Sequence, residues 1–329
     1  MRKLSLIAAC GIVLFAACNK NKTGEQEIVP EKEQVNMVAA RACAAYDVLE
    51  EQLRKDPSLQ QRMDEIEAFT ARYAANPAAF RVLADGNLEV PVVVNVLYNT
   101  AAQNVSDAQI QSQIAVLNAD FGGTNSDLNL TSTYNTVKFT SASTKPKIRF
   151  VLSAINRKST TNTSWGTNDA MKRSSSGGID PTSPTTTLNM WVCNLSGGIL
   201  GYAQFPGGAA ETDGVVCDDN AFGTTGTASA PFNKGRTATH EVGHYFNLRH
   251  IWGDRRCGND GVGDTPAHTG ANYGCPAAGT RSSCSGRPVM MTMNYMDYTD
   301  DACMYMFSLG QVDRMNATWA VGGPRASLR

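Results

Sequence analysis

Residues 240–250 have the sequence His-Glu-Val-Gly-His-Tyr-Phe-Asn-Leu-Arg-His and contain three of the four histidines of the chain. Positions i and i+4 of a helix share one face, so His240 and His244 can present imidazoles to a single metal ion. Asn247 stands where the helix must end if His250 is to reach a third corner, and asparagine tolerates a left-handed backbone. Three protein ligands leave a fourth position open, as in catalytic zinc sites.

Glu241 follows the first histidine and can reach a water molecule on such an ion without ligating it. This arrangement predicts metal-assisted hydrolysis with Glu241 as the general base. The alternative is a solvent-facing helix with scattered histidines. A third histidine at this spacing, in a chain so poor in histidine, argues against that alternative.

The stretch resembles the metzincin metallopeptidases, whose motif HExxHxxGxxH is followed by a Met-turn. Asn247 departs from the glycine of that motif. Asn294-Tyr-Met-Asp-Tyr298 resembles the Met-turn, which implies that Met296 forms a hydrophobic floor beneath the metal. The resemblance also implies that Tyr298 stabilises the transition state. An ordinary core position is the alternative for Met296.

Within the metzincins, the chain resembles the pappalysin family, its bacterial ulilysin-type members especially, over residues 88–316. The resemblance implies a zinc-dependent endopeptidase of α/β metzincin fold that acts on protein or peptide substrates. An upper subdomain would hold a twisted mixed sheet with a backing helix and the active-site helix. A lower, irregular subdomain would hold the Met-turn and the C-terminal helix. The motifs that carry the resemblance span residues 90–100, 106–121, 200–207, 213–216, 235–239 and 296–304.

Two features of the lower subdomain are implied by the same resemblance. A structural calcium site would follow the zinc motif, with an ordinary acidic turn as the alternative; its oxygen ligands would be Asp254, Asp260, Asp264 and Thr265. Two disulfides would tie this poorly periodic segment together, namely Cys257–Cys284 and Cys275–Cys303. Whether Cys193 pairs with Cys217 stays open.

Arg41-Ala42-Cys43 matches the Arg-x-Cys of pappalysin-type propeptides. The match implies a latent zymogen in which the Cys43 thiolate is a zinc ligand, because a thiolate ligates zinc more strongly than water does. The alternative is that Cys43 is a small buried hydrophobic residue.

Ulilysin-type enzymes prefer arginine immediately after the scissile bond. Asp300 and Asp301 follow the Met-turn, where a carboxylate would pair with a guanidinium, and solvated surface acids are the alternative. With this preference, self-cleavage is predicted at Phe80–Arg81, beside a turn signal, with Ala71–Arg72 as the second choice.

The first 18 residues have the anatomy of a secretory signal, with Arg2 and Lys3 before the apolar run Leu4–Ala17. Phe15-Ala-Ala-Cys18 resembles a bacterial lipobox, and a plain signal peptide is the alternative. We expect an exported protein, either a cell-surface or outer-membrane lipoprotein or a secreted enzyme. Membrane contact would occur only through the lipid anchor, and disulfides are permitted outside the cytoplasm.

Residues 19–80 are predicted to form a polar tether and a helical propeptide, and residues 81–329 the catalytic domain, divided into 81–250 and 251–329. Apolar residues at helical spacing between about 46 and 69 predict two amphipathic helices. Val90–Tyr98, Lys147–Ile155 and Leu188–Cys193 are predicted strands, and capping boxes predict helices that start after Ser106 and Ser308. Substrate is expected along an edge strand near Asp213–Val216.

The charge balance, 29 Lys and Arg against 30 Asp and Glu, offers no field of one sign for nucleic acid. Two other functions are the alternatives. A gluzincin peptidase would use a glutamate as the third ligand, and His250 argues against it. A zinc-dependent binding module without catalysis would not need Glu241 and Tyr298. The sequence leaves the physiological substrate and the oligomeric state open.

Overall fold

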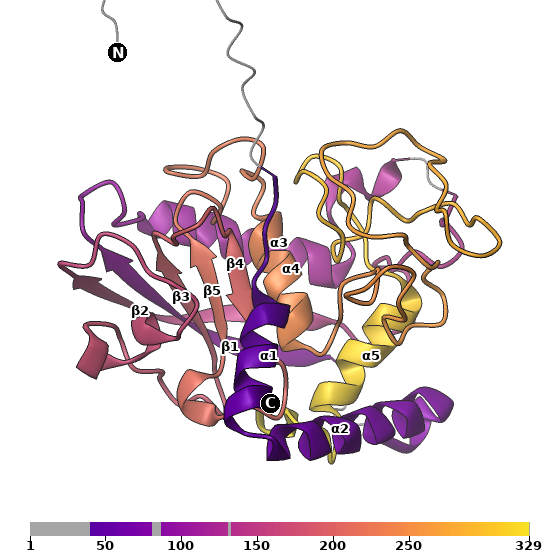
Figure 1. Cartoon of the computed structure of the whole chain (residues 1–329), viewed down its shortest axis with the longest axis horizontal. Coiled ribbons are helices and arrows are strands. Elements are labelled where there is room, and N and C mark those ends of the chain that lie inside the picture. The colour runs from indigo at the N-terminus through magenta and orange to yellow at the C-terminus, as the bar shows by residue number, and fades with distance from the viewer. Residues whose placement is uncertain (1–39, 81–86, 131–132, 329) are drawn as a thin grey trace, which may run out of the picture. The chain divides into compact units, whose positions relative to one another are not determined.

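The sheet is built from the apolar stretches that the sequence marks as strands. The computed structural model describes residues 40–80, 87–130 and 133–328. In these residues five strands form one sheet in the order β2-β1-β3-β5-β4 (Figure 1). β1 pairs in parallel with β2 and β3, and β3 pairs in parallel with β5, whereas the edge strand β4 is antiparallel to β5. The strands are Leu88–Tyr98 (β1), Ile148–Ser159 (β2), Leu188–Cys193 (β3), Gly201–Ala203 (β4) and Val215–Asp218 (β5).

The predicted strands are confirmed, with small changes at their ends. β3 has the predicted bounds and is buried at every position, as expected for a parallel strand covered on both faces. β2 continues to Ser159, beyond the predicted Ile155, because it stays paired with β1 as far as Tyr98. The mixed, mainly parallel sheet confirms the predicted α/β class.

The described residues contain five α-helices: α1 (Ala45–Lys55), α2 (Ser58–Ala75), α3 (Asp107–Gly122), α4 (Arg236–Tyr245) and α5 (Leu309–Trp319). The capping box of α5 is complete, since Ser308 and Gln311 bond each other's backbone. That of α3 is half formed: Ser106 Oγ accepts from Gln109 N, but the Gln109 side chain donates to the carbonyl of Phe222 instead. Short 3₁₀ helices occur at Pro77–Phe80, Ser126–Asn129, Ala170–Lys172, Ser174–Ser176, Ala210–Thr212 and Ala326–Leu328.

The helices cover the two faces of the sheet unequally. The larger core joins one face to α3, α4 and α5, and the smaller core joins the other face to α1. Cys217 belongs to the larger core and Cys193 to the smaller one, and both are free thiols. Because their side chains lie on opposite faces of the sheet, these two cysteines do not pair.

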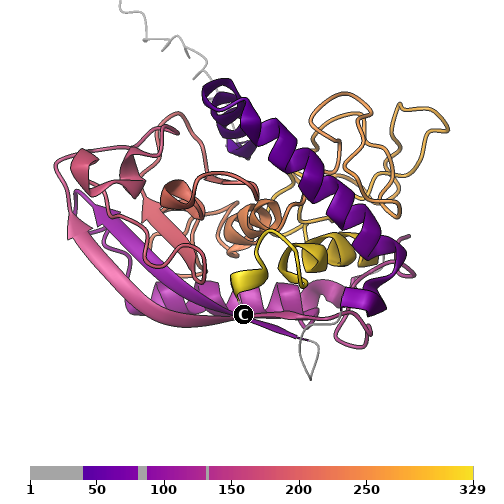
Figure 2. The ribbon, with the colours of Figure 1, turned by 90° about the horizontal axis from the view of Figure 1, so that it is seen from below.

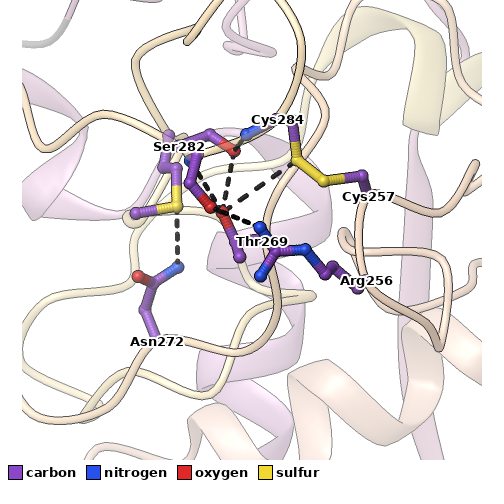
Figure 3. Close-up of a disulfide and its surroundings, with 8 residues drawn as sticks. Arg256, Cys257, Thr269, Asn272, Ser282 and Cys284 are labelled. Atoms are coloured by element: carbon purple, nitrogen blue, oxygen red, sulfur yellow. Dashed lines mark hydrogen bonds between the residues drawn. A yellow bond between two sulfur atoms is a disulfide. The ribbon is translucent and has the colours of Figure 1, made fainter.

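The segment between α4 and α5 has little regular structure and is tied by two disulfides. Cys257 pairs with Cys284, with Cα atoms 5.7 Å apart, and Cys275 pairs with Cys303, with Cα atoms 5.5 Å apart. Figure 3 shows the first bridge beside Thr269, whose hydroxyl lies 3.0 Å from that of Ser282. Such bridges stabilise an irregular segment by restricting its unfolded state.

Residues 40–80, here called the N-terminal segment, fold together with the rest of the described chain. They contain α1 and α2, which the sequence predicted, and α2 runs beside α5 (Figure 2). No helix in the described part of the chain is long and apolar enough to cross a membrane. The predicted signal with its lipobox, the predicted tether up to residue 34, and Arg81 of the predicted cleavage site lie outside the described residues.

Candidate active site

Helix α4 and the turn after it bring three histidines together. His240 and His244 lie one helical turn apart, and Asn247 takes a left-handed conformation with φ 70°. This turn reverses the chain and returns His250 to the same point, as its position in the sequence predicts. The Nε2 atom of His244 lies 3.1 Å from that of His240 and 3.2 Å from that of His250. All three rings are buried.

The opposite nitrogen of each ring is held by an acceptor. His240 Nδ1 lies 2.7 Å from the carbonyl oxygen of Tyr295, and His244 Nδ1 lies 2.7 Å from the carbonyl oxygen of Leu248. Nδ1 of His250 bonds the carboxylate of Asp254. Such acceptors fix the proton on Nδ1 and leave the Nε2 lone pairs free to ligate. Burial, aided by the neighbouring His250, lowers the pKa of His244 to about 3, so its ring is neutral.

A thiol completes this group. Cys43 Sγ and one nitrogen of each histidine all lie within 4.8 Å of one another, in the one such group of potential ligands among the described residues. Three convergent imidazoles and a thiol are the donor set that zinc favours, so the residues fit that metal. Burial, and to a smaller extent the nearby Glu241, raise the pKa of the Cys43 thiol well above its usual value. A divalent cation would favour the ligating thiolate instead.

Glu241 lies beside the histidines in a closely packed position. Its Oε2 atom is 3.3 Å from Cys43 Sγ, and burial raises its pKa to about 8, although Cys43 and Arg41 act to lower it. Gly201 of β4 lies next to it: a Cβ on Gly201 would stand 2.9 Å from Glu241 Cγ. Glycine at this position therefore makes room for the carboxylate.

The Met-turn segment lies under and beside the histidines. Met296 is fully buried, and its sulfur packs on α4 at Gly243, where a Cβ would come within 2.5 Å of it. Tyr298 places its ring 5.0 Å from the ring of His250, and its hydroxyl donates to the carbonyl oxygen of Cys43 at 3.1 Å. A peptide carbonyl thus lies within reach of the Tyr298 hydroxyl, beside the three imidazoles.

Sequence reasoning missed several residues that orient these groups. Trp252 stacks on His250 with ring centroids 4.4 Å apart and an interplanar angle of 5°. Asp297 accepts from the backbone N–H of Tyr298 at 2.8 Å and lies 3.4 Å from Nδ1 of His268, the fourth histidine. The sequence signal was closeness to the motif in the case of Trp252, and the rarity of histidine in this chain in the case of His268.

Two of the predicted calcium ligands, Asp260 and Thr265, bond each other, whereas Asp254 and Asp264 have other partners. Asp254 bonds His250, which makes it an orienting group for a zinc ligand. Asp264 accepts from Ser308 Oγ at 2.6 Å and from Gly310 N at 2.8 Å, at the start of α5. Asp260 accepts from Thr265 Oγ1 at 2.8 Å. Within the described residues, no three of these carboxylates form one cluster.

Of the two candidate specificity residues, Asp301 is the one that meets a guanidinium. It is fully buried and forms an ion pair with Arg41. Its other oxygen accepts from the backbone N–H groups of Lys234 and Arg236, at 2.8 and 3.2 Å. Asp300 forms no ion pair among the described residues.

The expected substrate edge was wrong. The interval near Asp213–Val216 contributes to β5, which is paired on both sides, with β3 and β4. The free edge belongs to β4, and the N-terminal segment occupies it. Leu200 N donates to the carbonyl of Ala42 at 2.9 Å, and Ala44 N donates to that of Gly201 at 3.1 Å, in a parallel arrangement.

Comparisons with known proteins agree with this geometry. Residues 184–320 match the peptidase M43 family model, described as pregnancy-associated plasma protein-A. An extracellular metalloprotease of Verticillium alfalfae is 35% identical over 245 residues, which cover 70% of this chain and 78% of that protein. The chain belongs to the pappalysin family. It is accordingly a zinc metalloendopeptidase, and its relatives named as extracellular indicate secretion.

Two solved structures show the same metzincin fold of the pappalysin family. Mature mirolysin of Tannerella forsythia in complex with a cleaved peptide is 43% identical, with a TM-score of 0.70, over 74% of this chain and 95% of that one. A mutant of promirolysin from the same organism is 39% identical, with a TM-score of 0.78, over 88% of this chain and 97% of that one. The match to the pro-form thus covers the larger share of this chain.

Proposed function

We propose that the chain is an exported zymogen of a zinc endopeptidase that cleaves peptide bonds before arginine, with Glu241 as general base. The observation that carries the proposal is the position of Arg41-Ala-Cys43. Its thiol lies at the three histidines and its guanidinium pairs with Asp301. His240, His244 and His250 would hold the zinc, which, when bound, supplies a Lewis acid for the scissile carbonyl and lowers the pKa of a water.

Two side chains of the site would handle protons and charge. Glu241 is placed to take a proton from the attacking water and to pass it to the leaving amine. Tyr298 already donates a hydrogen bond to the carbonyl of Cys43, at 3.1 Å. In a substrate complex the same hydroxyl would stabilise the oxyanion that develops on the scissile carbonyl.

The Arg41 contacts support a preference for arginine. Its guanidinium bonds Asp301, donates to Thr237 Oγ1 at 3.1 Å and donates to the carbonyl of Thr299 at 3.2 Å. Arginine presents several donors in a fixed fork that lysine cannot match. Arg41 precedes the residue at the histidines, whereas a substrate arginine would follow the scissile bond. The N-terminal segment would therefore lie in the cleft in the reverse direction, which protects it from cleavage.

Domain boundaries and anchoring complete the proposal. Residues 1–18 would be a lipoprotein signal, 19–80 a tether and propeptide, and 81–329 the catalytic domain. The lipid would be attached at Cys18, so a Cys18→Ala chain should fail to incorporate labelled palmitate.

Replacing Cys43 with alanine should shorten latency. The change removes the thiol that lies beside the three histidines but keeps the ion pair of Arg41 with Asp301. The full-length variant should therefore hydrolyse peptide faster than the uncleaved wild type. Initial rates on freshly purified chains measure this effect. Cys193→Ala removes a different free thiol, which is buried away from the histidines, and is the control. A Cys43→Ala chain as silent as the wild type would show that another group closes the site.

Calcium should stabilise the enzyme through a site that includes Asp260 and Thr265. Burial raises the pKa of Asp260, and a bound cation would offset the cost of burying its charge. Selective removal of calcium, with zinc restored, should lower the melting temperature by roughly 2–4 °C for each kcal/mol of binding energy lost. An Asp260→Asn chain should lose this dependence. Identical melting curves at zero and saturating calcium would eliminate the site.

A further inference from the structure

The helix α2 is fastened to α5 and to the turn that follows α4. Glu67 of α2 forms an ion pair with Arg314 of α5 through two hydrogen bonds, one of them 2.8 Å long, from Nη1 to Oε2. Arg314 is nearly buried, and its Nε donates to the carbonyl of Asn247 at 2.7 Å. Although burial raises the pKa of Glu67, Arg314 brings it below its usual value, so the carboxylate is charged.

Asn247 itself takes part in this contact. Its Nδ2 atom donates to Glu67 Oε1 at 3.3 Å. The metzincin motif has glycine at this position, and a glycine has no side chain to offer. The departure from the motif thus adds a donor that points at the N-terminal segment.

Apolar contacts lie on both sides of the ion pair. Phe69 and Tyr73 of α2 pack with Ala317 and Ala320 at the end of α5. In the other direction α2 covers Gly207, where a Cβ would lie 3.1 Å from Ile66 Cδ1. Figure 2 shows α2 running past the end of α4 and along α5. None of these contacts involves the histidines or Asp301.

We propose that the surface formed by Arg314, Asn247, Ala317 and Ala320 is a binding site for the propeptide after it has been cut from the enzyme. Cleavage after α2 would then leave the propeptide bound as a non-covalent inhibitor. The α2 contact holds Cys43 and Arg41 at high local concentration over the site, as in a bivalent ligand. The proposal rests on the proposed zymogen. It adds that full activity requires dissociation or destruction of the excised segment.

Glu67→Gln in the full-length chain tests this proposal. Glu67 lies on the segment that is removed, so wild type and variant yield the same mature enzyme. Glu65→Gln is the matched control, because Glu65 lies on the same helix, is exposed and bonds only Gln61. After self-processing, size-exclusion chromatography with intact-mass analysis measures how much propeptide elutes with the enzyme. Peptide hydrolysis after dilution measures the lag before full activity.

We expect co-elution and a lag in the wild type and in Glu65→Gln. Glu67→Gln should bind at least about tenfold more weakly, because the buried Arg314 loses its charged partner. Asn247→Gly should also weaken retention, but less, because it removes a single hydrogen bond. Equal retention of the propeptide in all four chains would overturn the proposal, and so would release of the wild-type propeptide at cleavage. Activity of the wild-type chain before any cleavage would instead contradict the proposed zymogen.

Discussion

Glu241→Ala is expected to bind zinc at the wild-type level and to lose peptide hydrolysis by at least about 10²–10⁴-fold. The carboxylate lies beside the three imidazoles without belonging to the ligand group. Its removal should therefore spare the metal and eliminate the base. The variant cannot process itself, so catalytic amounts of wild-type enzyme would remove its propeptide, followed by repurification. Metal analysis and initial rates on one peptide then give both quantities.

Glu211→Ala, which changes an exposed acid of a 3₁₀ helix, is the control for this measurement. It should retain both zinc and activity. A Glu241→Ala enzyme with full zinc and undiminished cleavage would refute the role of the base. A variant without zinc would show that the carboxylate helps to hold the metal.

Asp301→Asn should reduce the preference for arginine after the scissile bond, with little effect on the hydrolysis of other peptides. Asp301 is buried and pairs with Arg41, so a substrate arginine in the same place would lose a charged partner. Truncation of such pairs costs about 2–5 kcal/mol, or roughly 30-fold to several thousandfold in kcat/KM. Asparagine keeps an oxygen that can accept from the backbone N–H groups of Lys234 and Arg236.

The measurement compares two peptides that differ only in having arginine or leucine after the scissile bond. We expect a large loss of kcat/KM on the arginine peptide and little change on the leucine peptide. Asp300→Asn is the matched control and should leave both rates unchanged. Equal losses on both peptides would mean that Asp301 only supports the start of α4. In the wild type, N-terminal sequencing should find Arg81 at the start of the mature chain.

The local features of this protein could be predicted from the sequence. Spacing alone brought His240, His244 and His250 to one point, because two of them share a helix face and Asn247 permits the turn. A run of β-branched residues marked β1 as a strand. Both disulfides, which followed only from the family resemblance, are present.

Features that depend on distant parts of the chain could not be predicted. Arg41 and Asp301 are 260 positions apart, and no periodicity relates them. The edge strand was misplaced because β4 has three residues and β5 has four, which is too short for an alternating pattern. Asp254 was assigned to calcium from the family resemblance, whereas its position four residues after His250 puts it on the imidazole. The separation of Cys193 from Cys217 follows from sheet register alone.

We expect peptide hydrolysis by this chain to depend on a metal held by the three histidines. The most direct test is digestion of casein by the processed enzyme before chelation, after a zinc chelator, and after zinc is added back. We predict full loss of digestion with the chelator and recovery with a stoichiometric amount of zinc, and no recovery in a His244→Ala enzyme. Digestion that continues in the absence of zinc would contradict the account.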